Sequence, residues 1–186
     1  MAKFQNKYRI ESARKPEWDY RNPGQYFITI CTHEREHFFW GCSNGKMTLS
    51  TAGAIVQGFW FEIPKHFAHV RLGEFVVMPN HVHGVLILSE MVGDVGTNRD
   101  AENDNDKRQS PGFYKNITPK SGSISTIIGS FKSICTKHIR KTFPDLNFKW
   151  QERFHDHIIR NESSYTRISN YIINNPSKWK EDKFFK

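Results

Sequence analysis

The sequence predicts an α+β fold in which a mostly antiparallel sheet carries two core helices on one face. Three observations lead to this prediction. Segments with strand and helix patterns follow one another in the order strand, helix, strand, strand, helix, strand, helix. A Pro79-Asn80 turn joins two apolar runs, and two other segments carry apolar stripes at helical spacing. This order is the βαββαβ pattern of the ferredoxin-like fold with one helix appended.

The first half of the pattern opens with residues 26–32, which are rich in β-branched and aromatic side chains and predict a strand. Residues 41–46 are predicted to form a loop. Ser50 or Thr51 can then cap a helix over residues 52–66, in which apolar side chains recur at four-residue steps.

Two strands follow this helix, at residues 74–78 and 81–88. The second carries apolar residues on both faces and is therefore placed centrally in the sheet. Residues 90–122 are nearly all polar or charged, so we expect a flexible insertion that cannot bury enough apolar surface to become ordered. With a basic lead-in at residues 1–24, the whole chain, 1–186, is predicted to be a single domain.

The second half begins with Ser123 or Ser125, either of which can open a helix that ends near residue 142. Residues 148–160 have strand character. A final helix begins at Asn161 or Ser163 and has to stop at Pro176. Along one side of this final helix, spaced four residues apart, lie a guanidinium, a phenol and a carboxamide: Arg167, Tyr171 and Asn175.

The composition favours an anionic partner, because the formal net charge is +8 and the pI is near 9.4. The excess lies towards the C-terminal end, where residues 123–186 carry twelve basic and six acidic side chains. Three widely spaced cysteines fit neither a disulfide framework nor a Cys-x-x-Cys site. No segment has the length of a signal peptide core or a membrane span, so we expect a cytoplasmic protein with no membrane partner.

A histidine pair opens the strand at residues 81–88. Successive side chains of a strand point to opposite faces, so His81 and His83 should project together and form half of a metal site. A second pair, His155 and His157, could join the first in a tetrahedral zinc site. That alternative would leave the phenol and the carboxamide of the last helix unexplained.

Three motifs in this order resemble the single-tyrosine HUH transposases, and most closely the REP-associated tyrosine transposases and their insertion-sequence relatives. They are MPNHVHGV at residues 78–85, WQERFHDHIIR at residues 150–160 and YIINNP at residues 171–176. The resemblance implies that His81 and His83 are metal ligands, that Asn175 is a third ligand and that Tyr171 is the nucleophile. It also implies cleavage and rejoining of single-stranded DNA near hairpins, through a 5′-phosphotyrosyl intermediate.

The residues suit this chemistry. Two neutral imidazoles and one amide oxygen form an incomplete ligand shell that fits Mg²⁺ or Mn²⁺ and leaves positions for phosphate oxygens. Because a covalent link conserves phosphodiester energy, resealing needs no nucleotide cofactor. Basic and histidine side chains near the motifs are predicted to bind single-stranded or hairpin DNA: Arg167, Arg160, His157, Lys132, Lys137, Arg140 and Lys141.

Two other functions stay open at this point. One is a non-catalytic module of the same fold that binds single-stranded nucleic acid, and the other is a zinc hydrolase that uses both histidine pairs. A homodimer is possible, since the relatives can place the tyrosine helix in their own active site or in that of a partner.

Overall fold

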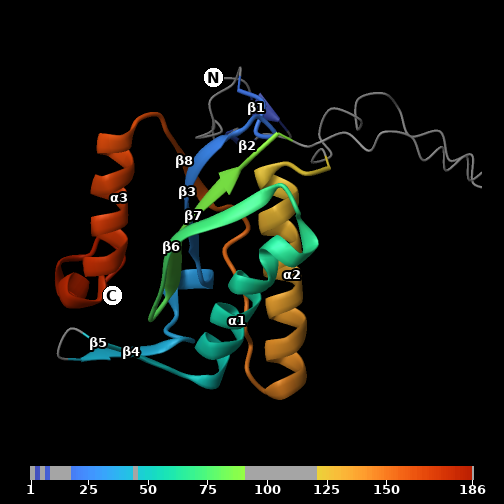
Figure 1. Ribbon diagram of the computed structural model, residues 1–186. Helices are drawn as coiled ribbons and strands as arrows, with labels where there is room; N and C mark the ends of the chain where they lie inside the picture. Colours follow the sequence, from blue (N-terminus) through green and yellow to red (C-terminus); the bar gives the residue numbers. More distant parts are fainter. Residues whose placement is uncertain (1–2, 5–6, 9–17, 44–45, 91–120, 186) are drawn as a thin grey trace, which may run out of the picture.

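The computed structural model describes residues 3–4, 7–8, 18–43, 46–90 and 121–185 (Figure 1). The predicted insertion, apart from its ends, and most of the basic lead-in lie outside the described residues. The elements are β1 Lys3–Phe4, β2 Lys7–Tyr8, β3 Gly24–Cys31, η1 His33–Arg35, β4 Trp40–Ser43, β5 Lys46–Leu49, α1 Thr51–His66, β6 Val70–Met78, β7 His81–Leu88, α2 Ile124–Thr142, β8 His155–Ile159, α3 Glu162–Asn174 and η3 Pro176–Glu181, where η marks a 3₁₀ helix.

A four-stranded antiparallel sheet in the order β6-β7-β3-β8 organises the molecule. Leaving aside the small hairpins β1-β2 and β4-β5, the chain follows the βαββαβ order, so the predicted fold class is confirmed. Strand β7 is central, as its two apolar faces predicted. Figure 1 shows α1 and α2 on one side of the sheet and α3 on the other.

Polar side chains begin all three α-helices at positions that the sequence predicted. Ser50 accepts a hydrogen bond from the backbone N–H of Gly53 at the start of α1. Ser123 and Asn161 do the same for α2 and α3, where Thr126 and Ser164 supply the N–H. Each cap satisfies an N–H group that has no partner inside its helix.

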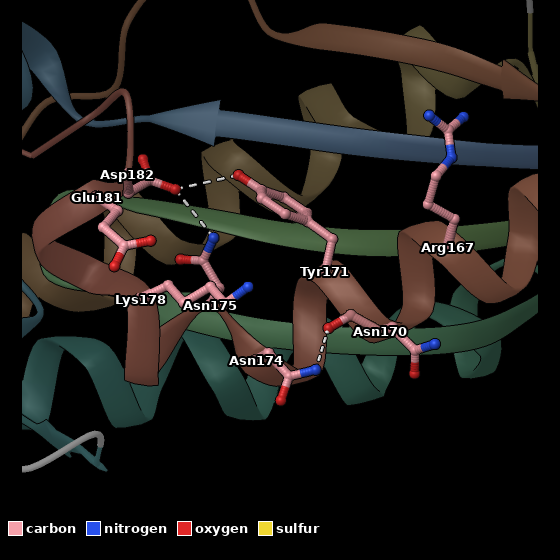
Figure 2. A pocket seen from close by; sticks show the side chains of 8 residues that line it. All are labelled: Arg167, Asn170, Tyr171, Asn174, Asn175, Lys178, Glu181 and Asp182. Carbon is pink, nitrogen blue, oxygen red and sulfur yellow. Dashed lines mark hydrogen bonds between the residues drawn. The ribbon is translucent and has the colours of Figure 1, made fainter.

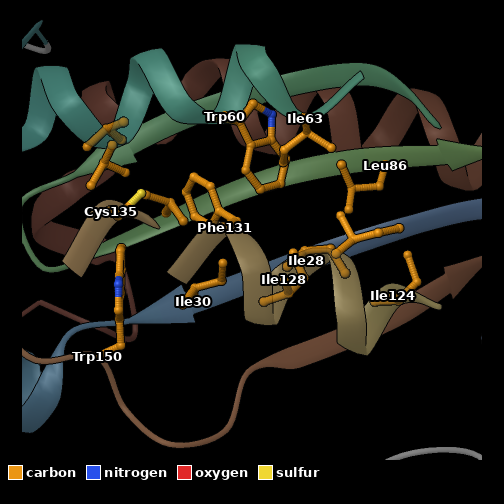
Figure 3. Packing of buried hydrophobic residues seen from close by; sticks show 14 of the residues in the cluster. Ile28, Ile30, Trp60, Ile63, Leu86, Ile124, Ile128, Phe131, Cys135 and Trp150 are labelled. Atoms are coloured by element: carbon orange, nitrogen blue, oxygen red, sulfur yellow. The ribbon is translucent and has the colours of Figure 1, made fainter. Parts of the chain in front are cut away.

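The main core lies between the sheet and the α1/α2 pair (Figure 3). The Trp60 ring on α1 stacks on Phe75 of β6, with centroids 4.5 Å apart, and meets Phe131 of α2 edge-on at 5.4 Å. Gly84 on β7 makes room for this ring, because a Cβ atom there would lie 2.3 Å from Trp60 Cζ2. A smaller cluster on the other face joins α3 to the sheet through Val85, Ile159, Ile168 and Ile172.

Two predictions of local structure are wrong. The predicted loop at residues 41–46 belongs to a hairpin, in which β4 pairs with β5. The predicted strand at residues 148–160 is shortened to β8, because β3 offers partners only from Gln25 to Thr29. Before β8 the chain makes a single bridge, between Thr32 and Trp150, and Phe148 packs into the core instead of joining the sheet.

Candidate active site

The two histidines of β7 point towards α3, on the sheet face opposite the main core. Both are buried, with 0% of His81 and 1% of His83 exposed. Their Nε2 atoms lie 3.1 Å apart. The expectation that the pair projects to one face is therefore confirmed.

Asn80 fixes the protonation of His81. Its Nδ2 donates to the backbone carbonyls of Arg35 at 3.2 Å and Phe184 at 2.9 Å, which leaves its Oδ1 facing His81 Nδ1 at 2.8 Å. Because Oδ1 is an acceptor, His81 Nδ1 carries the proton and donates to it. The Nε2 lone pair of His81 is therefore available to a metal ion.

Thr29 is the hydrogen-bond partner of the His83 ring. Its hydroxyl lies 2.8 Å from His83 Nδ1, across the β3-β7 ladder. A hydroxyl can donate or accept, so it suits either tautomer of the ring. When Thr29 accepts from Nδ1–H, the His83 Nε2 lone pair faces the same space as that of His81.

Burial keeps both imidazoles neutral. It lowers the pKa of His81 to about 3, and the positive charges of Lys183 and Arg35 act in the same direction. Burial, together with the neighbouring His81, also holds the pKa of His83 well below its usual value. Neutral imidazole is the form that binds metal ions.

Tyr171 on α3 reaches this pair from the other side of the site. Its hydroxyl lies 3.2 Å from His83 Nε2 and donates to Asp182 Oδ2 at 3.1 Å. The side chain is 39% exposed, so the phenol is open to a substrate. Burial of the hydroxyl, followed by the charge of Asp182, raises the pKa of Tyr171, so the phenol stays protonated at neutral pH.

Asn175 and Asp182 complete the group (Figure 2). Asn175 is 2% exposed; its Nδ2 donates to Asp182 Oδ2 at 2.9 Å, whereas its Oδ1 is buried without a hydrogen-bond partner in the protein. The ligand atoms of His81, His83 and Asp182 all lie within 4.8 Å of one another. Two imidazoles and a carboxylate are a donor set that fits a divalent cation.

Asp182 was not predicted from the sequence. It follows η3, which turns the chain back after Pro176 and brings residue 182 beside Tyr171 and Asn175. In the sequence, Asp182 is only an acidic residue a few positions beyond the YIINNP motif, and this does not identify a site residue.

Arg167 lies along the same side of α3 as Tyr171, as predicted. The two line a hollow of about 340 Å³ together with Asn175, Lys178 and Asp182. Figure 2 shows the Arg167 guanidinium on the far side of Tyr171 from Asp182. Tyr171 therefore has a cationic side chain on one side and an open volume beside it.

The other predicted DNA-binding residues lie further away. His157 and Arg160 are exposed at β8 and just beyond it, and the ladder places His157 opposite Phe27 on the α3 face. The basic residues of α2 lie on the opposite side of the sheet from Tyr171. Lys132 Nζ donates to the carbonyls of Gln151 and Glu152, Arg140 donates to the carbonyl of Phe148, and the side chains of Lys137 and Lys141 are exposed.

The four-histidine zinc site does not form. Within the described ranges, the group of possible metal ligands contains His81, His83 and Asp182 but not the second histidine pair. His155 stands opposite Thr29 on β8, one strand beyond β3, and is exposed. Among the described helices, none has the length and apolar character needed to cross a membrane.

Comparison with known proteins gives a relative in sequence and solved structures of similar fold. The chain is 36% identical over 178 residues to an uncharacterized protein of Haemophilus influenzae, across 94% of this chain and 92% of the other. No family model matches. The fold is similar to that of a REP-associated tyrosine transposase solved in complex with a REP hairpin, with a TM-score of 0.58 and 20% identity over 94% of this chain and 77% of that one.

Proposed function

We propose that this chain, which belongs to the same family as the Haemophilus influenzae protein, is a transposase-type endonuclease and strand transferase. It would cleave and rejoin single-stranded DNA next to hairpin sequences, through a 5′-phosphotyrosine intermediate. One observation carries the proposal: the Tyr171 hydroxyl lies 3.2 Å from Nε2 of His83, beside a second buried neutral imidazole. The transposase of similar fold, which is bound to a REP hairpin, supports the choice of DNA.

Tyr171 would act as the nucleophile. Its oxygen forms a bond to the phosphorus, the bond from phosphorus to the 3′-oxygen breaks, and the leaving oxygen takes up a proton to become a free 3′-hydroxyl. The phenolic proton would be lost to solvent as the new bond forms. In the resting site, the hydrogen bond to Asp182 holds the phenol in place for this step.

His81 and His83 would hold Mg²⁺ or Mn²⁺, with Asn175 as the third ligand that the family resemblance implies. When bound, the cation would supply positive charge to the non-bridging phosphate oxygens, where negative charge sits in the transition state. Asn80 keeps His81 in the tautomer that can bind a metal ion, and Thr29 holds the orientation of the His83 ring. All these groups come from one chain in this structure, and the possible homodimer would not have to supply any of them.

The DNA would lie over the α3 face. Arg167 is placed to grip a phosphate in the hollow, and the exposed His157 and Arg160 extend the same face towards β8. The basic side of α2, with Lys132, Lys137, Arg140 and Lys141, would bind the hairpin stem at a distance from Tyr171. Such a substrate would be met in the cytoplasm, the location predicted from the sequence.

The test is to incubate the protein and Mn²⁺ with a single-stranded hairpin oligonucleotide that is labelled at either its 3′ or its 5′ end. With a label at the 3′ end, the DNA should move with the protein on a denaturing gel; with a label at the 5′ end, a shorter free fragment should appear. Tyr171→Phe and excess chelator should each abolish both products. Tight hairpin binding by the wild-type protein without any adduct would instead support the non-catalytic nucleic-acid-binding module.

A further inference from the structure

The carboxylate of Asp182 lies in the site but has no part in the chemistry that the family resemblance implies. We propose that Asp182 is a further, charged ligand of the metal site, and that Asn175 orients this carboxylate through its Nδ2. The role of the metal is taken from the proposed function. The geometry comes from His81, His83 and Asp182, whose ligand atoms lie within 4.8 Å of one another.

Charge balance favours a carboxylate among the ligands. Two neutral imidazoles and a carboxamide would leave a divalent cation uncompensated in a place where both histidines are buried. Burying an unpaired charge is costly. A carboxylate supplies the missing negative charge, and it is the side chain through which Mg²⁺ is ordinarily held.

The carboxylate is also held in a fixed orientation. Its Oδ1 accepts from the backbone N–H of Phe184 at 2.7 Å, and its Oδ2 accepts from Asn175 Nδ2 at 2.9 Å. Ligating carboxylates in metal sites are commonly hydrogen-bonded in this way. Asn175 therefore has the contact expected of a residue that supports a ligand.

The segment that carries Asp182 is tied to the histidines. Asn80 Nδ2 donates to the carbonyl of Phe184, while Asn80 Oδ1 accepts a hydrogen bond from His81 Nδ1–H. The Arg35 guanidinium donates to the carbonyl of Lys183 at 3.3 Å. One buried asparagine thus sets the position of His81 and of the chain that follows Asp182.

Binding of Mn²⁺ alone, measured on the full chain by the electron paramagnetic resonance of the free ion, tests this assignment. We expect Asp182→Asn to raise the Kd at least about 100-fold and Asn175→Ala about tenfold. Glu181→Gln, which removes the neighbouring carboxylate in the same hollow, should change the Kd less than about twofold. Circular dichroism shows whether each variant is folded. If Asp182→Asn does not fold, Asp182→Ser is tested in its place.

The outcomes separate this inference from the proposed function. If Asp182→Asn binds Mn²⁺ like the wild type while Asn175→Ala does not, Asn175 is the ligand and the inference is overturned. If Asp182→Asn loses adduct formation but keeps Mn²⁺ affinity, the carboxylate serves Tyr171 and not the metal. If Mn²⁺ binding depends on Asp182 but wild-type protein forms no DNA adduct, the ligand assignment stands and the proposed function fails.

Discussion

The two faces of the β6-β7-β3-β8 sheet are built by the same strands and carry different kinds of residue. On β7, Val82 and Leu86 point into the main core under α1 and α2, whereas His81 and His83 point towards α3. On β3, Ile28 joins the main core and Thr29 hydrogen-bonds to His83. Because successive side chains of a strand point to opposite faces, each of these two strands contributes both to the main core and to the site.

The difference shows where stability comes from. The α1/α2 face buries large apolar side chains, each of which contributes free energy as it leaves water. On the α3 face the buried groups include two histidines and three polar side chains whose hydrogen bonds mainly offset the cost of removing them from water: His81, His83, Thr29, Asn80 and Asn175. We therefore expect damage to the first face to cost stability, and damage to the second face to cost metal binding.

The largest effect on stability should come from Trp60→Ala. The ring is fully buried between Phe75 and Phe131, so its loss leaves a cavity and should lower the free energy of unfolding by about 3–5 kcal/mol. Urea denaturation measures this, and Mn²⁺ affinity at low temperature, where the variant stays folded, should match the wild type. A weakened Mn²⁺ affinity in the folded variant would show that the two faces are coupled.

Two neighbouring residues on β3 offer a matched pair of substitutions. Thr29→Val keeps the shape but removes the hydrogen bond to His83 Nδ1, so we expect Mn²⁺ affinity to fall about 10–100-fold. Ile28→Val should leave that affinity unchanged and cost about 0.5–1.5 kcal/mol of stability. Titration with Mn²⁺ and urea denaturation of both variants give the comparison; equal metal affinities would contradict the role assigned to Thr29.

Acid should weaken the α3 face through its buried histidines. Burial lowers the pKa of His81 from 6.5 to about 3, so between these values the unfolded chain binds a proton that the folded chain does not. Stability is therefore full above about pH 6.5 and falls as the pH drops, by up to about 1.4 kcal/mol per pH unit for each such histidine. Urea midpoints between pH 6.5 and 5, measured in chelator, should show this slope.

A substitution of His81 tests whether this histidine is responsible. His81→Asn should reduce the slope by about one proton. Urea midpoints that do not change between pH 6.5 and 5 would mean that the buried pair accepts protons without loss of structure.

Much of this architecture follows from periodicity in the sequence. A two-residue period placed His81 and His83 on one face, and a four-residue period aligned Arg167 and Tyr171 on α3 with Asn175 at its C-cap. Local periodicity could not reveal Asp182, because its position depends on the turn at η3 and on the hydrogen bond from Asn80 to Phe184.

The β4-β5 hairpin was missed for a related reason. Its two strands have four residues each, so their pattern is too short to distinguish from a loop. The sequence alone therefore lacked both the long-range contacts that place Asp182 and a pattern long enough to identify this hairpin.

The most direct test of the account is to find the atom that carries the DNA. Wild-type protein would be incubated with a single-stranded hairpin oligonucleotide and Mn²⁺, digested, and the nucleotide-bearing peptide identified by mass spectrometry. The account predicts a nucleotide joined through its 5′-phosphate to the hydroxyl of Tyr171. A nucleotide on Tyr165, one of the other tyrosines and also on α3, or on any residue other than Tyr171, would contradict it.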